Sequence, residues 1–260
     1  MRILETQEVT RAFGGVVAVN QVNFNVEKGL VNGLIGPNGA GKTTLFNQIT
    51  GMDVPTSGKI MFDGKDITGL PAWKISRLGI ARTFQNIRLY NDLTVVENVM
   101  MGLHSKVGSD PFHGRFIQAV KSYFQAGKEN RELYVRALEW LDFFDLSHLK
   151  DEYARNLPYG NQRELEIARA LAADPKILFL DEPAAGMNPA ETAHLMKIIE
   201  MIRDKGITVV LIEHDMKLVM NICDNITVLS FGQKIAEGTP EEIRSNPLVI
   251  EAYLGKEDEE

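Results

Sequence analysis

The chain has 260 residues, a formal net charge of −7, 44% hydrophobic residues and 24% charged residues. These are ordinary globular values that exclude a disordered chain, and the length suffices for one large domain with an inserted lobe. The negative balance argues against broad binding to a nucleic-acid backbone or an anionic lipid surface.

Cysteine and hydrophobic patterning restrict the class further. Cys223 is the only cysteine, which excludes an internal disulfide, and we expect it to be a small buried apolar side chain. No run approaches the roughly 18 apolar residues of a membrane span, and the first residues lack the apolar core of a signal peptide. We therefore expect a cytoplasmic chain, with the acidic end at 256–260 as a solvated terminus.

The first third of the chain has strand signals followed by a helix signal. Short β-type runs at 16–19 and 22–26, separated by Gly and Asn, predict a small antiparallel layer. An apolar run at 30–35 predicts a strand that enters a glycine-rich loop. A helix should follow and end near Thr50, with Gly51 as its C-terminal glycine.

Helical patterning replaces strand signals between 89 and 157, which predicts an inserted helical subdomain. Continuous apolar runs at 177–180 and 207–212 are typical of parallel strands buried on both faces. Thr239 begins a capping-box spacing with proline at the first helical position, so a helix should follow it. Asn246 and the proline after it should open another helix.

The strongest motif is G-x-x-x-x-G-K-[ST] between the strand at 30–35 and the following helix. In this loop, backbone N–H groups curl around phosphate oxygens, and the helix N-terminus adds positive potential. Lys42 should reach the β- and γ-phosphates, Thr43 should place its hydroxyl on Mg²⁺, and Thr44 should contact the α-phosphate. The expected nucleotide-binding residues are Gly36, Pro37, Asn38, Gly39, Ala40, Gly41, Lys42, Thr43 and Thr44.

Two carboxylates follow the apolar run at 177–180. Asp181 should lie at the carboxyl end of the strand and help to hold Mg²⁺. Glu182 could orient and deprotonate an attacking water, which hydrolysis of a nucleotide requires, so it is the general-base candidate. The alternative is that the two carboxylates only complement the positive end of a helix. The G-x-x-x-x-G-K-[ST] motif, called the P-loop, disfavours this alternative.

His214 follows the strand at 207–212 and should therefore lie at the same sheet edge, where it could hydrogen-bond the γ-phosphate. The four other histidines have no such context. Gln85 stands where strand-rich sequence gives way to helical sequence, and by itself it would be an unremarkable surface amide.

Taken in order, the P-loop, Gln85, the segment 157–162, the pair Asp181–Glu182 and His214 resemble the ATP-binding subunits of ABC transporters. The resemblance covers nearly the whole chain. It implies an α/β fold with a P-loop NTPase core of mainly parallel sheet, an antiparallel β subdomain and an inserted α-helical subdomain. We expect one domain, with a catalytic core at 1–88 and 158–238, a helical subdomain at 89–157 and a C-terminal helical extension at 239–260.

The resemblance also implies roles for residues that are uninformative alone. Phe13 would stack on adenine. The alternative, that Phe13 is a turn residue that caps the edge sheet, remains open. Gln85 would reach Mg²⁺ and the attacking water and move with the helical subdomain. The implied cofactors are ATP and Mg²⁺, and the implied catalytic residues are Glu182, His214, Gln85 and Lys42.

The signature segment departs from the usual L-S-G-G-Q of the family. Here it is Leu157 followed by Pro158, Tyr159, Gly160 and Asn161. Members of the family present this segment from the opposite subunit at a helix start, so that backbone N–H groups face the γ-phosphate. The proline and the asparagine replace the usual serine and glutamine, so contact across a dimer could be weaker. Similarly, Asn188 replaces the aspartate of a loop that connects the two sites in the family.

Within the family, the chain looks most like the branched-chain amino-acid group. The matching segments are Arg82–Gln85, Ala184–Gly186, Glu213–Met220, Asn246–Pro247 and Ala252–Gly255. An insert at about 104–131 also fits this group, although its aromatic residues could equally serve packing within the helical subdomain.

This resemblance implies membrane-spanning permease subunits, a second copy or a related ATPase in an ATP-sandwich dimer, and a solute-binding protein that acts indirectly. A peripheral place at the cytoplasmic side of the membrane follows, with a permease-docking surface expected at 85–101. The rival class is a soluble, non-transport ABC ATPase that remodels a protein or nucleic-acid complex. A P-loop kinase or GTPase is disfavoured, because Glu182 suits water activation and no Asn-Lys-x-Asp motif occurs.

Overall fold

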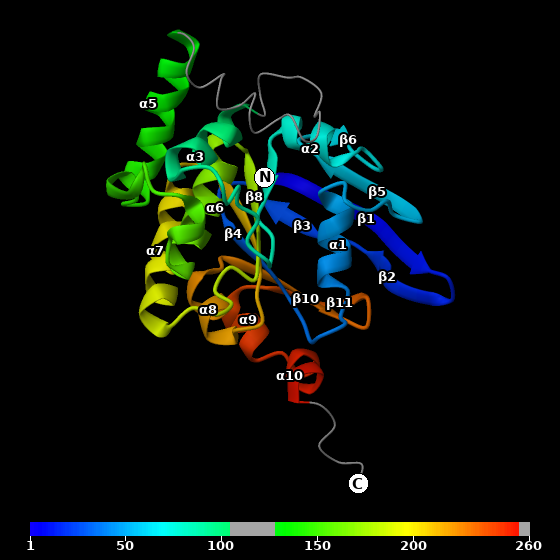
Figure 1. Cartoon of the computed structure of the whole chain (residues 1–260). Coiled ribbons are helices and arrows are strands. Elements are labelled where there is room, and N and C mark those ends of the chain that lie inside the picture. Colours follow the sequence, from blue (N-terminus) through cyan, green and yellow to red (C-terminus); the bar gives the residue numbers. More distant parts are fainter. Residues whose placement is uncertain (105–127, 255–260) are drawn as a thin grey trace. The chain divides into compact units, whose positions relative to one another are not determined.

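The computed structural model describes residues 1–104 and 128–254 (Figure 1). The chain forms two compact units, the first from residues 1–85 and 176–260 and the second from residues 86–175. The second unit includes the segment 158–175, which the sequence analysis assigned to the catalytic core. The insert expected at 104–131 lies almost entirely outside the described residues.

A six-stranded sheet forms the centre of the first unit, in the order β11-β10-β4-β9-β8-β7. All neighbouring pairs are parallel except β10 with β11. The strands are β4 (Val31–Ile35), β7 (Ile80–Arg82), β8 (Ile177–Asp181), β9 (Thr208–Ile212), β10 (Asn225–Ser230) and β11 (Gln233–Gly238). Every residue of β4, β8 and β9 is buried, as expected for parallel strands covered on both faces. The three predicted central strands are therefore confirmed.

The antiparallel layer of the first unit has the strand order β2-β1-β5-β6, and β3 also pairs with β1. The strands are β1 (Arg2–Phe13), β2 (Val16–Val22), β3 (Asn25–Glu27), β5 (Ser57–Phe62) and β6 (Lys65–Asp66). The layer is confirmed, but the run expected at 22–26 is broken. The Thr6 hydroxyl donates to Val22 O and accepts from Phe24 N, both at 2.8 Å, so a side chain shares the link between these segments with the backbone bond from Thr6 N to Phe24 O.

The helices of the first unit are α1 (Lys42–Ile49), α2 (Ala72–Leu78), α7 (Pro189–Asp204), α8 (Met216–Ile222), α9 (Pro240–Arg244) and α10 (Pro247–Leu254). Four of them, α7 to α10, begin after a residue whose side chain accepts a hydrogen bond from the first turn, whereas α1 and α2 lack such a cap. The predicted capping box of Thr239 is present, with Glu242 as its second member. The helix after Asn246 is α10, which confirms that prediction. Cys223 is buried, and burial raises the pKa of its thiol to about 12, so it behaves as the expected apolar side chain.

An edge-to-face aromatic pair joins α1 to the central sheet. The ring centroids of Phe46 and Phe179 lie 4.8 Å apart at an interplanar angle of 85°, and both side chains are fully buried. Phe46 belongs to α1 and Phe179 to β8, so this contact fixes the helix that follows the P-loop against the strand that ends at Asp181.

The second unit is helical in its described part. Its elements are α3 (Val95–His104), α5 (Lys128–Phe143), α6 (Tyr159–Ala172) and two 3-10 turns, η1 (Ser147–Leu149) and η2 (Ala154–Asn156). Helix α6 packs against both α3 and α5, which explains why it belongs to this unit. A Cβ atom on Gly102 would lie 2.1 Å from Arg169 O, so glycine permits the close approach of α3 to α6.

Candidate nucleotide-binding and hydrolysis site

Strand register brings three loops to one edge of the central sheet. Ile212 of β9 lies opposite Leu34 of β4 and also opposite Asp181 of β8. Because these strands are parallel, the segments that follow them leave the sheet at the same, carboxyl-terminal edge. Those segments are the glycine-rich loop at 36–41, the loop that begins at Glu182, and the turn at 213–215.

The glycines of the first loop are required by backbone conformation and space. Gly39 and Gly41 have φ values of 78° and 98°. A Cβ atom at Gly36 would lie 2.1 Å from Leu229 O, and one at Gly41 would lie 2.5 Å from Ala18 O. The loop is therefore held closely against neighbouring backbone, in the strand-to-helix setting that phosphate-binding loops use.

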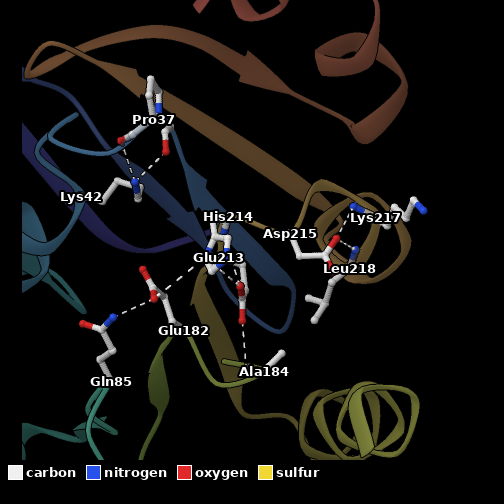
Figure 2. Close-up of polar contacts among 11 residues, drawn as sticks. Pro37, Lys42, Gln85, Glu182, Ala184, Glu213, His214, Asp215, Lys217 and Leu218 are labelled. Carbon is white, nitrogen blue, oxygen red and sulfur yellow. Dashed lines mark hydrogen bonds and ion pairs between the residues drawn. The ribbon is translucent and has the colours of Figure 1, made fainter. Parts of the chain in front are cut away.

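Lys42 folds back onto this loop (Figure 2). Its Nζ donates to Gly36 O at 2.6 Å and to Pro37 O at 2.9 Å, and the side chain is buried. Burial lowers the pKa of the Lys42 ammonium, while the negative charges of Glu182 and Asp181 oppose that shift. The ammonium thus lies near both carboxylates that the sequence analysis selected.

Asp181 is held by an arginine that the sequence analysis quoted only as part of a family segment. Arg82 Nη2 donates to Asp181 Oδ2 at 2.7 Å, and the two side chains are only 7% and 6% exposed. The other terminal nitrogen, Nη1, donates to Asn47 Oδ1 at 2.7 Å and Thr50 Oγ1 at 3.1 Å. Arg82 therefore connects α1 to the end of β8.

Glu182 has polar contacts with two other predicted catalytic side chains, those of Gln85 and His214. Gln85 Nε2 donates to Glu182 Oε2 at 2.9 Å, and His214 Nδ1 lies 3.9 Å from the same oxygen (Figure 2). Glu182 N donates to Ile212 O, and its backbone has a left-handed φ of 45°. The residue therefore has a constrained backbone, and it is placed where an acid–base group could serve one reacting atom.

Glu213 is another possible site residue, and it was not predicted. It directly precedes His214 in the sequence, and its side chain is buried. Its carboxylate accepts hydrogen bonds from backbone N–H groups of two loops of the site. A buried acid at a strand end beside a motif histidine is a signal that the sequence contains. Its partner Ala184 could only be known once β8 and β9 were paired.

The predicted magnesium ligands are oxygen donors, which is the chemistry that Mg²⁺ prefers. Thr43 is exposed in the first turn of α1, and Asp181 Oδ1 takes no hydrogen bond from the described residues. No group of three or more His, Cys, Asp or Glu side chains in residues 1–104 and 128–254 could hold a metal ion. Mg²⁺ usually combines few protein ligands with nucleotide phosphates, so this sparse set fits it. Its binding remains a prediction.

Phe13 lies next to the hairpin turn between β1 and β2 and is half exposed. The Arg11 guanidinium lies 4.4 Å from the centroid of its ring and also pairs with Asp53 at 2.7 Å. An exposed, electron-rich ring could stack on a base, and the adenine role of Phe13 stays a prediction. Thr44 lies in the first turn of α1, half-buried.

The signature segment lies at a helix start, as the resemblance implied. Pro158 is the residue before α6, Tyr159 opens the helix, Gly160 is buried, and Asn161 follows. Gln162 Nε2 donates to Leu157 O at 2.9 Å, so this side chain is used locally. The segment belongs to the second unit, and its contact with nucleotide remains a prediction.

The order of the central strands, the P-loop, and the two carboxylates at the end of β8 and directly after it define a P-loop nucleotide-binding protein. The family described as ABC transporter matches residues 19–185, and the family described as branched-chain amino acid ATP-binding cassette transporter matches residues 233–259. The chain is 49% identical, over 98% of both chains, to BraF of Pseudomonas aeruginosa, a high-affinity branched-chain amino acid transport ATP-binding protein. The chain therefore belongs to the ABC transporter ATP-binding proteins, in their branched-chain amino-acid group.

Solved structures agree with this assignment. A nucleotide-free ATP-binding cassette from an ABC transporter superposes with a TM-score of 0.86 and 36% identity, over 98% of this chain and all of the other. The cassette MJ0796, solved as a dimer bound to ADP and Pi, gives a TM-score of 0.74 and 27% identity over 91% of this chain and 98% of the other. The expected fold class is thereby confirmed.

We expect Arg82→Met to lower the free energy of unfolding by about 3 to 5 kcal/mol, because it leaves the buried Asp181 carboxylate unpaired. Chemical denaturation of the nucleotide-free chain measures this. The control is Arg136→Met, which removes the ion pair between Arg136 and Asp174. These two side chains are 39% and 44% exposed, so the loss should be less than about 1 kcal/mol. Equal losses in the two variants would contradict a special role for the Arg82–Asp181 pair.

Proposed function

We propose that this chain binds ATP with Mg²⁺ and hydrolyses the ATP to energise an importer of branched-chain amino acids. The observation that carries the hydrolytic part is the placement of Gln85 and His214 around Glu182 at the sheet edge that also carries the P-loop. The solute is proposed from the relatives, since BraF is a high-affinity branched-chain amino acid transport protein. Leucine, isoleucine and valine are the expected solutes.

Three of the proposed catalytic side chains, those of Lys42, Glu182 and Gln85, make hydrogen bonds within the chain. Lys42 donates to two P-loop carbonyls, and Glu182 accepts from Gln85. We propose that Lys42 exchanges these carbonyls for β- and γ-phosphate oxygens, which are stronger acceptors because they are charged. Gln85 would exchange Glu182 for Mg²⁺ and the attacking water, which frees Glu182 Oε2 to accept a proton.

Hydrolysis then follows from the positions of these side chains. Glu182 takes a proton from water as the water oxygen attacks the γ-phosphorus in line, and the bond to the ADP oxygen breaks with its electron pair leaving on ADP. His214 donates a hydrogen bond to the γ-phosphate, and Lys42 balances its charge. Thr43, Asp181 and Gln85 would hold Mg²⁺, which when bound would neutralise negative charge that develops on the phosphates.

A closed site is proposed to need a second ATPase. MJ0796 forms a dimer with ADP and Pi, and this chain would pair either with a second copy or with a related ATPase. The helix start at Pro158, Tyr159, Gly160 and Asn161 would face the γ-phosphate of the partner subunit through backbone N–H groups. Phe13 would stack on adenine in its own subunit.

The remaining partners and the location follow from the same proposal. Membrane-spanning permease subunits would receive the closing motion through the segment 85–101, where Tyr90 is exposed. A solute-binding protein would act indirectly, and the ATPase would lie at the cytoplasmic face of the membrane. No helix in the described parts of the chain is both long enough and apolar enough to span a membrane.

The test is to purify the tagged full chain from detergent-solubilised native membranes and identify co-purifying proteins by mass spectrometry. We expect two multi-span permeases and a second ATPase, followed by ATP-dependent leucine uptake in vesicles made with that complex. The rival function, a soluble ABC ATPase that remodels a protein or nucleic-acid complex, predicts only soluble partners. That result would overturn the transport proposal and leave the ATPase intact.

A further inference from the structure

Glu213 is a buried acid beside the hydrolysis site that the proposed mechanism does not use. Its side chain is only 1% exposed, whereas the neighbouring His214 is exposed. Burial raises the pKa of the Glu213 carboxyl group, and the backbone N–H groups of Ala184, His214 and Asp215 oppose that shift. An acid that is kept in such a place needs a reason, because burying a carboxylate is costly unless it is paired or hydrogen-bonded.

The two oxygens of Glu213 accept hydrogen bonds from two different loops. Oε1 accepts from Ala184 N at 3.0 Å, and Oε2 accepts from His214 N at 3.2 Å. Figure 2 shows the carboxylate between these two residues, with Glu182 on the other side of His214. His214 Nδ1 also lies 3.8 Å from Oε2.

This arrangement connects the segments that carry Glu182 and His214. Ala184 is two residues after Glu182 in the loop that leaves β8, and His214 is in the turn that leaves β9. The two strands are neighbours, and Asp181 pairs with Ile212. Beyond the sheet, Glu182 N still donates to Ile212 O at 2.9 Å, and Glu213 supplies the next link between the same two segments.

We propose that Glu213 is a positioning residue for ATP hydrolysis, because it fixes the loop of Glu182 and the backbone of His214 to each other. This inference rests on the proposed roles of Glu182 and His214. A carboxylate suits the task because both of its oxygens accept, whereas the N–H groups of both loops can only donate. Misplacement of a catalytic group by about 1 Å can cost up to about 100-fold in rate.

Glutamine is the informative replacement because it keeps the size and shape of the side chain. It offers one acceptor oxygen, so its amide nitrogen would face one of the two backbone N–H donors, and that link would open. Glu213→Asp is the second variant, because it keeps both oxygens and the charge but shortens the reach by one methylene. Glu213→Asp replaces Glu213→Gln in the experiment if the glutamine variant does not fold.

The experiment compares these variants in the purified transporter complex, with ATP hydrolysis and ATP affinity measured separately. We expect Glu213→Gln to lower kcat about tenfold with KM for ATP and ATP affinity within about twofold of the parent. Asp224→Asn is the matched control. Its carboxylate accepts from the backbone N–H of Val31, at the start of β4 and away from the site, at 2.7 Å. We expect its kcat to be that of the parent.

A double-mutant cycle with His214→Ala measures how much of the effect passes through the histidine. If Glu213 acted only through His214, Glu213→Gln would lower kcat less than about twofold further in the His214→Ala background; because it also fixes the loop of Glu182, we expect a further loss between about twofold and tenfold. A parental kcat in Glu213→Gln, or a loss of kcat matched by an equal loss of ATP affinity, would overturn the inference while the roles of Glu182 and His214 stand. A parental rate in Glu182→Gln would instead overturn the proposed role of Glu182, and with it this inference.

Discussion

Glu182→Gln is expected to reduce ATP hydrolysis by at least about 100-fold while ATP binding is retained. The replacement has the same shape but cannot accept a proton from the attacking water. Glu182 lies outside the P-loop, so the phosphate-binding backbone should be unchanged. Phosphate release measures the rate, and equilibrium binding of ATP measures the affinity.

The same variant should accumulate an ATP-dependent pair of ATPase subunits, because closure precedes hydrolysis in the proposed cycle. Size-exclusion chromatography with and without ATP detects it. Glu200→Gln, at an exposed glutamate of α7, is the control and should hydrolyse ATP normally. If Glu182→Gln releases phosphate at the parental rate, Glu182 is not the general base.

Local sequence patterns were sufficient for much of the fold and for placing the candidate site residues at one sheet edge. The P-loop and the pair Asp181–Glu182 each come directly after an apolar strand, and parallel strands bring the loops at their carboxyl ends to one sheet edge. The capping box of Thr239 is equally local and was confirmed. Strand β1 was not predicted, because its pairing has register shifts and Glu8 within it has a left-handed φ of 48°.

Partners that depend on strand pairing could not be predicted from the sequence. Arg82 and Asp181 are 99 residues apart, and Glu213 and Ala184 are 29 residues apart. Each pair becomes close only through the order β9-β8-β7. Asn188 is a different case, because its capping box with Glu191 was present in the sequence but was not identified. That box gives Asn188 a structural role at the start of α7.

Lys42→Met is expected to weaken ATP binding by about 10- to 100-fold, since it removes a charge-assisted contact with the phosphates. Without ATP, the free energy of unfolding should fall by less than the free energy of ATP binding does. Burial lowers the pKa of the Lys42 ammonium, so its charged form is less favoured in the folded state than in the unfolded state. Methionine removes this cost, although Gly36 O and Pro37 O lose a donor.

Thermal or chemical unfolding with and without ATP separates these two effects in one experiment. At an ATP concentration about 100 times the parental Kd, binding should stabilise the parent by about 2.7 kcal/mol, whereas a 100-fold weaker Kd leaves about 0.4 kcal/mol. Lys197→Met, at an exposed lysine of α7, should keep the parental ATP effect. A Lys42→Met variant that ATP stabilises as strongly as the parent would contradict phosphate binding by Lys42, whereas one that is much less stable without ATP would assign Lys42 chiefly to holding the loop.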